Sequence, residues 1–401
     1  MENKRFPQLC DNKTCTGCMA CVNACAHGAL TFTKDDEGFY RPLLNADKCV
    51  KCGLCEKTCP IITPVKRQNE RDLKVYAAWH KDEAIRAKST SGGAFSALAS
   101  VVLGKGGVVY GASYTDDLTI KHIEVSDDAG LGKLRLSKYA QSHIGDIFQQ
   151  VKKRLFEGRW VMFVGTPCQV AGLKNYLHKD YDNLILVDFY CHGVPSIDLF
   201  QQYAKWLEAK HGKIQNFVFR DKRKGWYDSL RVIEKANGNH HILRGNDDAY
   251  WESFNHYDNS MQECCYACKV QGLPRISDIT IADFWRIGQH VPFAHIDEIE
   301  KGVSSVAVNN PRLLSFIQEA EAFMCIEPRT IEESIKGNPA SVKSSIRPKD
   351  RDTLYKDLRV MSFDDLRCKY MTTTWKQKSV KIFREYLPYP IIKYVRLRKQ
   401  K

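Results

Sequence analysis

The sequence lacks a long apolar run. No uninterrupted apolar stretch among its 401 residues approaches the ~20 residues that a helix needs to cross a bilayer. The first residues, Met1 to Arg5, are polar and lead directly into cysteines, without the apolar segment that a signal peptide contains. We therefore expect a cytoplasmic protein without a transmembrane segment, attached at most to a membrane surface.

Acidic residues are fewer than basic ones, 47 against 60, which gives a formal net charge of +13. The excess is concentrated from Lys376 onward, where nine Lys and Arg residues face one acid, Glu385. A solvated basic tail explains this pattern. Docking to an acidic redox partner or to an anionic membrane face is the alternative. No nucleic-acid-binding motif accompanies the charge, so we expect no nucleic-acid partner.

Cysteine, in contrast, is abundant, with 16 residues that are mostly clustered. Disulfide scaffolds belong mainly to small secreted domains, whereas clustered cysteines in a long chain without an export signal more often bind metal. Two runs share the spacing Cys-x2-Cys-x2-Cys-x3-Cys. They are Cys15, Cys18, Cys21 and Cys25, and then Cys49, Cys52, Cys55 and Cys59, the second run being followed by Pro60.

This spacing predicts a ferredoxin-type domain with two [4Fe–4S] clusters, in which the last cysteine of each run ligates the other cluster. One ligand set is then Cys15, Cys18, Cys21 and Cys59, and the other is Cys49, Cys52, Cys55 and Cys25. Gly17 and Gly53 sit in the loops, where the backbone must turn closely around sulfur. Zinc, the alternative metal, prefers Cys-x2-Cys pairs separated by longer loops. Cys10 lies outside both runs and is interpreted as a spare thiol.

After residue 72 the hydrophobic pattern becomes that of an α/β fold, in which buried strands alternate with helices. We expect strands over Val75–Trp79, Gly107–Ala112, Trp160–Val164, Leu184–Tyr190 and Asp278–Phe284, and helices over Ala94–Leu103 and from Cys168 to Leu177. After Ala340 the sequence is polar and irregular, with weak helical signals.

Four more cysteines fall at places where an α/β fold builds sites. Cys168 and Cys191 each follow an expected strand, and Cys265 and Cys268 form a Cys-x2-Cys loop. Open α/β sheets place their sites at the carboxyl ends of strands, so these thiolates could form a third metal site. A structural zinc site and scattered buried thiols are the alternatives. Cys325 and Cys368 have no motif around them.

A turn of small residues, Ser89-Thr90-Ser91-Gly92-Gly93, precedes the helix expected from Ala94. Free backbone N–H groups at a helix N-terminus can bind phosphate. The alternative is an ordinary helix start with an N-cap. His192, Lys222 and Lys224 could contact a substrate, but an ordinary surface or core role is the more common explanation for such residues.

With these motifs the chain resembles the coenzyme F420 hydrogenase/dehydrogenase beta-subunit family. No single motif is specific, but they occur in the family's order over about residues 73–320. The matching segments are Ser89–Phe95, Ser137–Ser142, Gly165–Gln169, Cys191–Ser196, Phe219–Lys222 with Gly225 and Trp226, Cys265–Cys268, Arg275–Thr280 and Asp283–Trp285.

The resemblance implies an iron–sulfur flavoprotein whose α/β body holds FAD and a third [4Fe–4S] cluster. It assigns that cluster to Cys168, Cys191, Cys265 and Cys268. It also implies that Ser89, Thr90, Ser91, Gly92 and Gly93 contact the FAD phosphates together with Lys138, and that Asp283, Phe284 and Trp285 border the flavin. The catalytic residues are not identified.

These expectations divide the chain into five parts: a ferredoxin-type domain (1–62), a linker (63–72), beta-subunit N-terminal-like (73–158) and C-terminal-like (159–340) domains, and a basic C-terminal segment (341–401). The implied function is an oxidoreductase that relays electrons between the clusters and FAD. Its substrate would be a deazaflavin such as coenzyme F420 or a small organic molecule, the latter in surface-polysaccharide biosynthesis. A non-catalytic electron-transfer subunit of a larger redox complex is the alternative, and a hydrogenase- or dehydrogenase-type subunit is then the expected partner. A metal-stabilised scaffold without flavin is a third interpretation.

Overall fold

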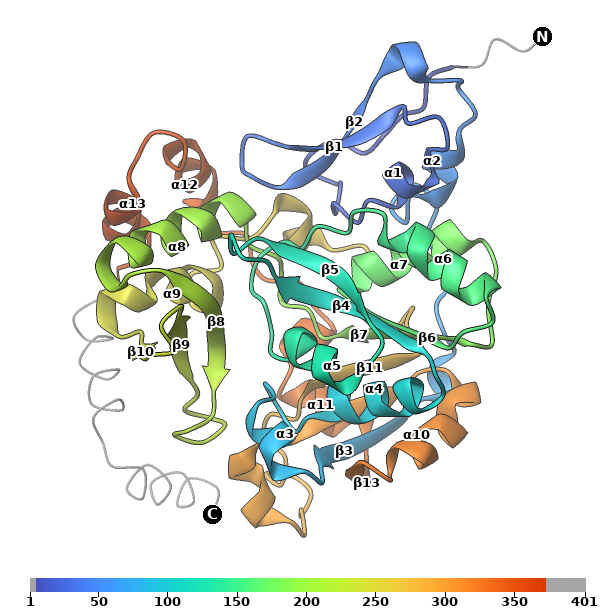
Figure 1. The fold of residues 1–401 in the computed structure, drawn as a ribbon, viewed down its shortest axis with the longest axis vertical. Helices are drawn as coiled ribbons and strands as arrows, with labels where there is room; N and C mark the ends of the chain where they lie inside the picture. Colours follow the sequence, from blue (N-terminus) through green and yellow to red (C-terminus); the bar gives the residue numbers. More distant parts are fainter. Residues whose placement is uncertain (1–4, 373–401) are drawn as a thin grey trace.

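The computed structural model describes residues 5–372, which form three connected parts (Figure 1). Residues 5–62, here called the ferredoxin module, lie at one end of the molecule. In this module β1 (Leu30–Lys34) pairs antiparallel with β2 (Tyr40–Leu44), and two short helices, α1 (Ala20–Ala24) and α2 (Leu54–Thr58), pack against each other. The expected order of a ferredoxin-type domain followed by an α/β body is confirmed.

The body is built on one mixed sheet of eight strands. In spatial order these are β13 (Met324–Arg329), β3 (Lys74–His80), β12 (Ser304–Val308), β11 (Ile279–Asp283), β7 (Leu184–Phe189), β6 (Val161–Val164), β4 (Val108–Tyr114) and β5 (Ile120–Val125). The four central strands β11, β7, β6 and β4 are parallel, and the outer strands pair antiparallel. All five strands expected from the sequence are present, shifted by at most two residues at their ends.

Helices cover both faces of this sheet. They are α3 (Glu83–Ala87), α4 (Ala94–Gly104), α5 (Asp128–Leu134), α6 (Ile147–Phe156), α7 (Pro167–Leu177), α10 (Leu314–Ala320) and α11 (Ile331–Lys336). Successive residues of a strand point to opposite faces. Val161 and Phe163 of β6 therefore pack with α6 and α7, whereas Met162 packs with α4 and α10 on the other side. This alternation gives the body three layers.

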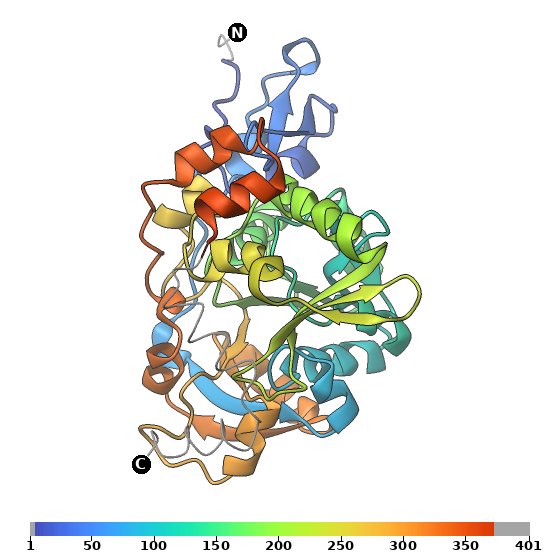
Figure 2. The same ribbon diagram turned by 90° about the vertical axis from the view of Figure 1, so that its left-hand side faces the viewer.

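A second lobe lies beside the sheet (Figures 1 and 2). It contains a three-stranded antiparallel sheet of β8 (Ile214–Asp221), β9 (Leu230–Lys235) and β10 (His240–Ile242), together with α8 (Ile197–His211), α9 (Ala249–Asn255), α12 (Arg351–Asp357) and α13 (Phe363–Tyr370). Its core is aromatic and includes Phe200, Tyr203, Phe217 and Tyr250. The irregular sequence after Ala340 thus forms two helices, because Leu354 and Leu366 are buried in this core.

The ferredoxin module is fastened to both other parts. Its helix α1 packs on α7 of the body, and Asn23 donates a hydrogen bond to the carbonyl of Gly145 at 2.9 Å. On the other side, the buried Arg351 of α12 binds both carboxylate oxygens of Glu37. The two residues are 314 positions apart in the chain. Figure 2 shows α12 and α13 directly beside the module.

The segment expected to be a linker is held in place. Arg67 donates hydrogen bonds to the carbonyls of Lys269, Gln271 and Pro274 at 3.1, 2.9 and 2.8 Å. The backbone N–H of Gln68 binds the carbonyl of Arg275 at 2.7 Å. The segment is therefore not a flexible linker, because the guanidinium of Arg67 satisfies backbone carbonyl groups in a loop of the body.

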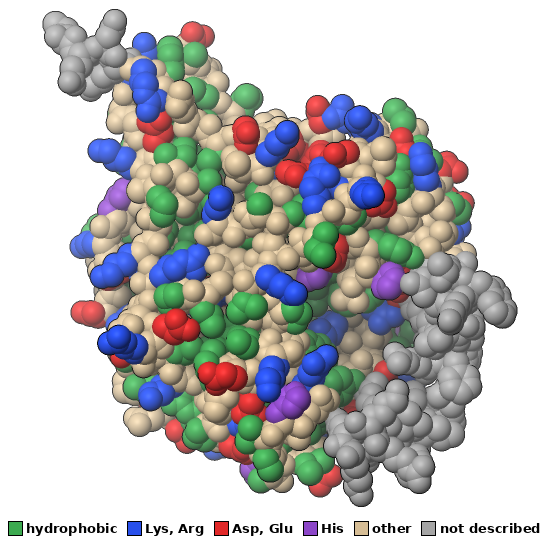
Figure 3. All heavy atoms as spheres, turned by 180° about the vertical axis from the view of Figure 1, so that it is seen from behind, with side chains coloured by type: hydrophobic (Ala, Val, Ile, Leu, Met, Phe, Trp, Pro, Cys, Tyr) green, Lys and Arg blue, Asp and Glu red, His purple; other side chains and the backbone are tan. Residues whose placement is uncertain are grey.

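The two expected parts of the body share one sheet. Strand β3, from the part before residue 158, lies between β12 and β13 of the part after it. The boundary in the sequence therefore does not separate two structural units. The basic residues from Lys376 onward lie outside the described residues. On the face shown in Figure 3, Lys and Arg side chains are interspersed with Asp and Glu, so positive charge does not gather in one patch there.

None of the helices in residues 5–372 combines the length and the apolarity needed to cross a bilayer.

Candidate functional site

The two cysteine runs of the ferredoxin module have the same backbone path. In each run the second and the fourth residue after the first cysteine have positive φ. These are Gly17 (67°) and Met19 (62°) in the first run, and Lys51 (56°) and Gly53 (73°) in the second. Glycine adopts this conformation without a steric penalty, whereas Met and Lys do not. Because each run keeps the path with only one glycine, the loop geometry is imposed by the site and not by the glycines alone.

The first predicted ligand set comes together in space. Burial raises the pKa of Cys21, and the nearby thiols of Cys15 and Cys59 raise it further. Cys18 is buried, and its pKa is raised mainly by burial and also by Cys21 and Cys59. The thiol of Cys59, from the second run, thus lies near the thiols of the first run, and its role as the fourth ligand stays a prediction.

The second predicted set, Cys25, Cys49, Cys52 and Cys55, lines one small pocket of the module. Burial raises the pKa of Cys55 to about 11. A thiol with such a pKa stays protonated at neutral pH unless a metal displaces the proton. All 16 cysteines of the chain are free of disulfides. The residues present thus fit two thiolate-ligated clusters.

The third set converges at the carboxyl edge of the large sheet. The parallel strands β6 and β7 end side by side, and Cys168 and Cys191 follow them. Cys265 and Cys268 come from the short 3-10 helix Glu263–Ala267 and the residue after it. The pKa of Cys191 is raised by burial and by all three other thiols. Burial raises the pKa of Cys168 to about 12. Four partly buried cysteines that come together at one edge of the sheet fit a metal centre better than scattered structural cysteines.

The remaining cysteines differ in their surroundings. Cys10 Sγ lies 3.6 Å from Cys59 Sγ, and its hydrogen bond lowers the pKa of Cys59. Cys264 is buried beside Cys265. Cys325 lies on β13, and Cys368 is exposed on α13. Cys10 is therefore a neighbour of the first set, a position that its place outside the runs did not reveal.

A cavity of about 720 Å³ lies between the body and the second lobe. Cys168 and Cys191 form part of its wall, and so do Thr16 and Gly17 of the ferredoxin module. Of the nine residues expected to bind a cofactor, seven line it: Ser89, Thr90, Ser91, Gly93, Lys138, Asp283 and Trp285. The cavity thus connects the third cysteine set with the turn before α4.

The turn before α4 faces the cavity at the point where the helix begins. Gly93 is its N-cap, with φ of 91°, and Ala94 and Phe95 line the cavity. The first N–H groups of a helix have no partner within the helix and can bind an anion. Gly92, expected as a contact, instead faces the sheet. Its N–H donates to Ser304 Oγ at 3.0 Å, so it is already satisfied.

Gly92 is nevertheless required by the packing. A Cβ at this position would lie 2.3 Å from the carbonyl oxygen of Ala78, so no other residue fits without moving β3. The glycine therefore brings the turn close to the sheet, and its expected contact with a cofactor is corrected.

The Asp283–Trp285 segment ends β11 and divides between cavity and core. Asp283 accepts a hydrogen bond from Trp226 Nε1 at 2.8 Å and forms an ion pair with Arg220 at 3.2 Å. Trp285 lines the cavity and stacks on Trp226, with ring centroids 4.5 Å apart. Phe284, expected beside the flavin, is fully buried in a hydrophobic cluster behind them. Phe284 follows the last residue of β11, and its backbone N–H donates to the carbonyl of Val303 at 2.9 Å, while its ring packs in the core.

Three ionisable side chains near the turn have different roles. Lys138 lines the cavity, donates to the carbonyls of Lys133 and Arg135 at 3.0 and 2.6 Å, and has its pKa lowered to about 7 by burial. His192 lines the cavity with Nε2 at 2.6 Å from Asp258 Oδ1. Lys222 instead donates to three backbone carbonyls, those of Arg86, Ser91 and Lys301, and so fastens the turn.

Several residues that line the cavity were not predicted, because no motif in the sequence marks them. Arg220 and Arg231 add positive charge to the wall, and Trp251 and Tyr227 add aromatic rings. Both arginines and both aromatic residues come from the second lobe and the loops that join it to the body. Arg220 lies in the Phe219–Lys222 segment that carries the family resemblance, but nothing in a lone arginine on a strand indicates which face it occupies.

Two segments of the chain match models of known protein families. Residues 14–61 match the family model described as 4Fe-4S dicluster domain, and residues 158–334 match the model for the C terminus of the coenzyme F420 hydrogenase/dehydrogenase beta subunit. Over 181 residues, 44% of this chain and 27% of the relative, the sequence is 29% identical to the coenzyme F420-dependent sulfite reductase of Methanocaldococcus jannaschii. The match thus spans about a quarter of that relative's length.

Two further likenesses are shorter or weaker. The archaeal-type glutamate synthase [NADPH] of Thermotoga maritima is 35% identical over 75 residues, 19% of this chain and 14% of that protein. A chain of the F420-reducing [NiFe] hydrogenase complex from Methanosarcina barkeri is similar with a TM-score of 0.45 and 17% identity, covering 76% of this chain and 91% of that one. The family matches and the cysteine geometry agree on an iron–sulfur protein: residues 14–61 are similar to 4Fe-4S dicluster domains, and residues 158–334 are similar to the C terminus of the coenzyme F420 hydrogenase/dehydrogenase beta subunit.

Proposed function

We propose that the chain is an iron–sulfur flavoprotein oxidoreductase that carries three [4Fe–4S] clusters and binds FAD in the central cavity. One observation carries the proposal: Cys168 and Cys191 of the third cysteine set line the same cavity as the turn before α4. A metal centre at that set would thus touch the space in which a redox cofactor is held. When bound, the clusters supply one-electron transfer, and the flavin supplies the exchange between one and two electrons.

The three cysteine sets follow one another toward the cavity. The second set, which lines the small pocket of the module, is here called the pocket set. Its member Cys55 is close enough to raise the pKa of Cys21 in the first set. Cys168 of the third set in turn raises the pKa of Cys18. The order is therefore pocket set, first set, third set, cavity, with the pocket set farthest out. This order supports entry or exit of electrons at the outer end of the ferredoxin module.

Three features of the cavity support FAD as its ligand. Its volume lies within the range of cofactor pockets, about 300–1,000 Å³. The N-terminus of α4 and the side chain of Lys138 lie where they can hold phosphate oxygens. The rings of Trp285, Trp251 and Tyr227 offer flat apolar surfaces for the planar ring system. We assign Ser89, Thr90, Ser91 and Gly93 to the phosphate contacts.

The protein's own residues would position and shield the reacting molecule. Arg220 is held over the Trp285 ring at 5.0 Å by its ion pair with Asp283, so its charge faces the cavity in a fixed place. His192 follows Cys191 directly, lines the cavity and is oriented by Asp258 through Nε2. The catalytic role of either residue is part of the proposal.

The same wall supports one class of substrate. Arg220, Arg231 and Lys138 favour an anionic partner, and a deazaflavin such as coenzyme F420 is the substrate we propose first. The sulfite reductase relative carries coenzyme F420 dependence in its name, which supports this choice. A small anionic organic molecule in surface-polysaccharide biosynthesis is the alternative.

A non-catalytic electron-transfer subunit is the second candidate. The match covers about a quarter of the sulfite reductase relative, so most of that relative's length lies outside the match. In this case the outer face of the ferredoxin module or the cavity mouth would meet a hydrogenase- or dehydrogenase-type subunit. Turnover by the purified chain with an artificial electron donor separates the two candidates.

The test is a cofactor count on protein purified without oxygen. We expect about twelve iron atoms, about twelve sulfides and one FAD per chain, because three cubane clusters each hold four of both. Reduced methyl viologen should then bleach the flavin, and added coenzyme F420 should reoxidise it. About eight irons without flavin would refute the proposal for the body and leave only the ferredoxin module.

A further inference from the structure

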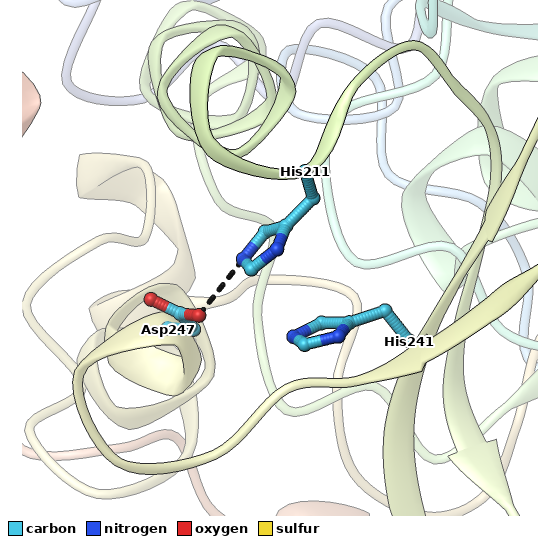
Figure 4. Close-up of side chains that lie close together, drawn as sticks. All are labelled: His211, His241 and Asp247. Carbon is cyan, nitrogen blue, oxygen red and sulfur yellow. Dashed lines mark hydrogen bonds and ion pairs between the residues drawn. The ribbon is translucent and has the colours of Figure 1, made fainter.

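A cluster of metal-ligand side chains lies in the second lobe, away from the cysteine sets. It consists of His211 at the end of α8, His241 on β10 and Asp247 in the 3-10 helix Gly245–Asp248. One ligand atom from each residue lies within 4.8 Å of the other two. Figure 4 shows both imidazole rings directed toward the carboxylate from different elements. All three side chains are partly buried.

Contacts within the second lobe hold the three side chains in this arrangement. The rings of His211 and His241 are stacked with centroids 4.0 Å apart. Asp247 is fixed through its backbone, because its N–H binds the carbonyl of Arg244 at 3.0 Å and its carbonyl accepts from Tyr203 Oη at 2.7 Å. The convergence is therefore a property of the packed lobe and does not depend on one mobile side chain.

We propose that His211, His241 and Asp247 bind a divalent transition-metal ion, with Zn²⁺ as the best match. Two imidazole nitrogens and one carboxylate oxygen form a donor set that suits zinc and other late first-row metals, whereas Mg²⁺ and Ca²⁺ prefer oxygen ligands. Zinc with three protein ligands keeps a fourth position for water, and the partial exposure of the three side chains allows this. His211 is the last residue of α8, where the helix dipole favours a cation.

A simple ion pair is the competing interpretation. Asp247 Oδ2 lies 2.9 Å from His211 Nε2, and Oδ1 lies 3.3 Å from Lys210 Nζ. The two contacts use different oxygens of the carboxylate. A metal can therefore take Oδ2 while Lys210 stays on Oδ1, an arrangement in which the second contact orients the ligand. Lys210 also leaves the metal position open, since its Nζ lies over the Trp206 ring, 3.6 Å from the ring centroid.

The site adjoins the wall of the central cavity. Asp248, next to Asp247, accepts hydrogen bonds from the guanidinium of Arg231, which lines the cavity. An ion that fixes the loop of Asp247 would thus fix the arginine as well. The inference does not depend on the proposed flavin, because its three ligands lie outside the cavity.

Zinc binding can be measured on the full chain with its clusters intact. Anaerobically purified protein is dialysed against Zn²⁺, and zinc and iron are both counted by mass spectrometry. We expect one zinc per chain in the wild type and loss of that zinc in His241→Ala and in Asp247→Asn, with iron unchanged in all proteins. Zn²⁺ should raise the Tm of the wild type but not of the two variants.

His240→Ala is the matched control. His240 is the neighbour of His241 on β10, is exposed, and lies 3.8 Å from Glu234. It should bind zinc like the wild type. The proposal is overturned if the wild type binds no zinc, or if His241→Ala and Asp247→Asn keep it, which would place any zinc at cysteines. Circular dichroism and the unchanged iron count identify a misfolded variant, and His241→Gln then replaces His241→Ala.

Discussion

Cys18 of the ferredoxin module packs directly on Gly172 of α7. A Cβ at Gly172 would lie 2.9 Å from Cys18 Sγ and 3.3 Å from the Cβ of Ala20, closer than ordinary contacts. Because Gly172 has no side chain, α1 can approach α7 closely. This contact therefore sets the distance between the first cysteine set and the third. The separation between the module and the body is controlled at this contact.

Replacing Gly172 by Val should separate the two parts. We expect a loss of about 1–3 kcal/mol in the free energy of unfolding, as for other overpacked contacts. We also expect slower reduction of the cavity cofactor when electrons enter through the module. Urea unfolding and stopped-flow absorbance measure the two effects. Gly132→Ala in α5 is the control, because its Cβ meets nothing within 4 Å; it should stabilise the protein by about 0.5–1 kcal/mol.

Replacing Cys168 by Ser should remove one metal centre and leave the others. We expect the variant to lose about four iron atoms per chain and to keep its flavin, since a cubane core holds four irons and the proposed phosphate contacts come from other segments of the chain. Electron flow from the module to the cavity should stop. Cys325→Ser on β13 should match the wild type in iron and rate. An unchanged iron count in Cys168→Ser would exclude the third cluster.

Replacing Arg220 by Met should destabilise the protein markedly. Asp283 would lose its cationic partner at a site where only 15% of its side chain is exposed. Removing one member of a buried pair costs about 3–5 kcal/mol, and we expect about 2–3 kcal/mol here because Trp226 still binds the carboxylate. Arg223→Met, which breaks the more exposed pair with Asp221, should cost less than about 1 kcal/mol. Equal losses in the two variants would contradict this account.

Binding of an anionic cofactor should take up a proton at Lys138. Burial lowers the pKa of this lysine to about 7, so at pH 8 it is mostly neutral in the empty cavity. A phosphate beside it favours the charged form, and FAD binding should weaken as the pH rises above about 7, by at most tenfold per pH unit. His122, the buried histidine near Lys138, does not contribute, because burial lowers its pKa to about 4.

Calorimetry in two buffers with different ionisation enthalpies measures the proton uptake. We expect close to one proton per FAD at pH 8 in the wild type and none in Lys138→Met. Lys138→Arg should bind FAD without uptake, because arginine is already charged. The same lysine affects the stability of the protein without FAD. Between pH 7 and about 10 the unfolded chain holds the lysine proton and the folded chain does not, so this lysine makes stability rise with pH in that window.

The sequence was sufficient for features that depend on local spacing and period. The eight cysteines of the module carry a spacing that few sites use, and strands such as Leu184–Phe189 are continuous apolar runs. Cys168 and Cys191 could be related because parallel strands end at one edge of a sheet. Each of these inferences needs only neighbours along the chain and one rule of topology.

The predictions that the structure did not support, and the features that were not predicted, depend on contacts between distant segments. Gly92 and Phe284 lie in segments that do reach the cavity, but their own direction is set by Ser304 and by the cluster around Trp226. The position of β3 between β12 and β13 reflects pairing across more than 200 residues. His211 and His241 are 30 positions apart and meet through the lobe's packing, which no local pattern encodes.

The ion pair between Glu37 and Arg351 has a consequence for the order of assembly during synthesis. Ribosomes add about 5–20 residues per second, so the 314 residues between the two take roughly 15–60 s to appear. Through that interval the cysteines of the module have left the ribosome while the α12 contact that holds it is still unmade. We therefore expect the module's cysteines to be accessible to iron and sulfide before α12 and α13 close against the module.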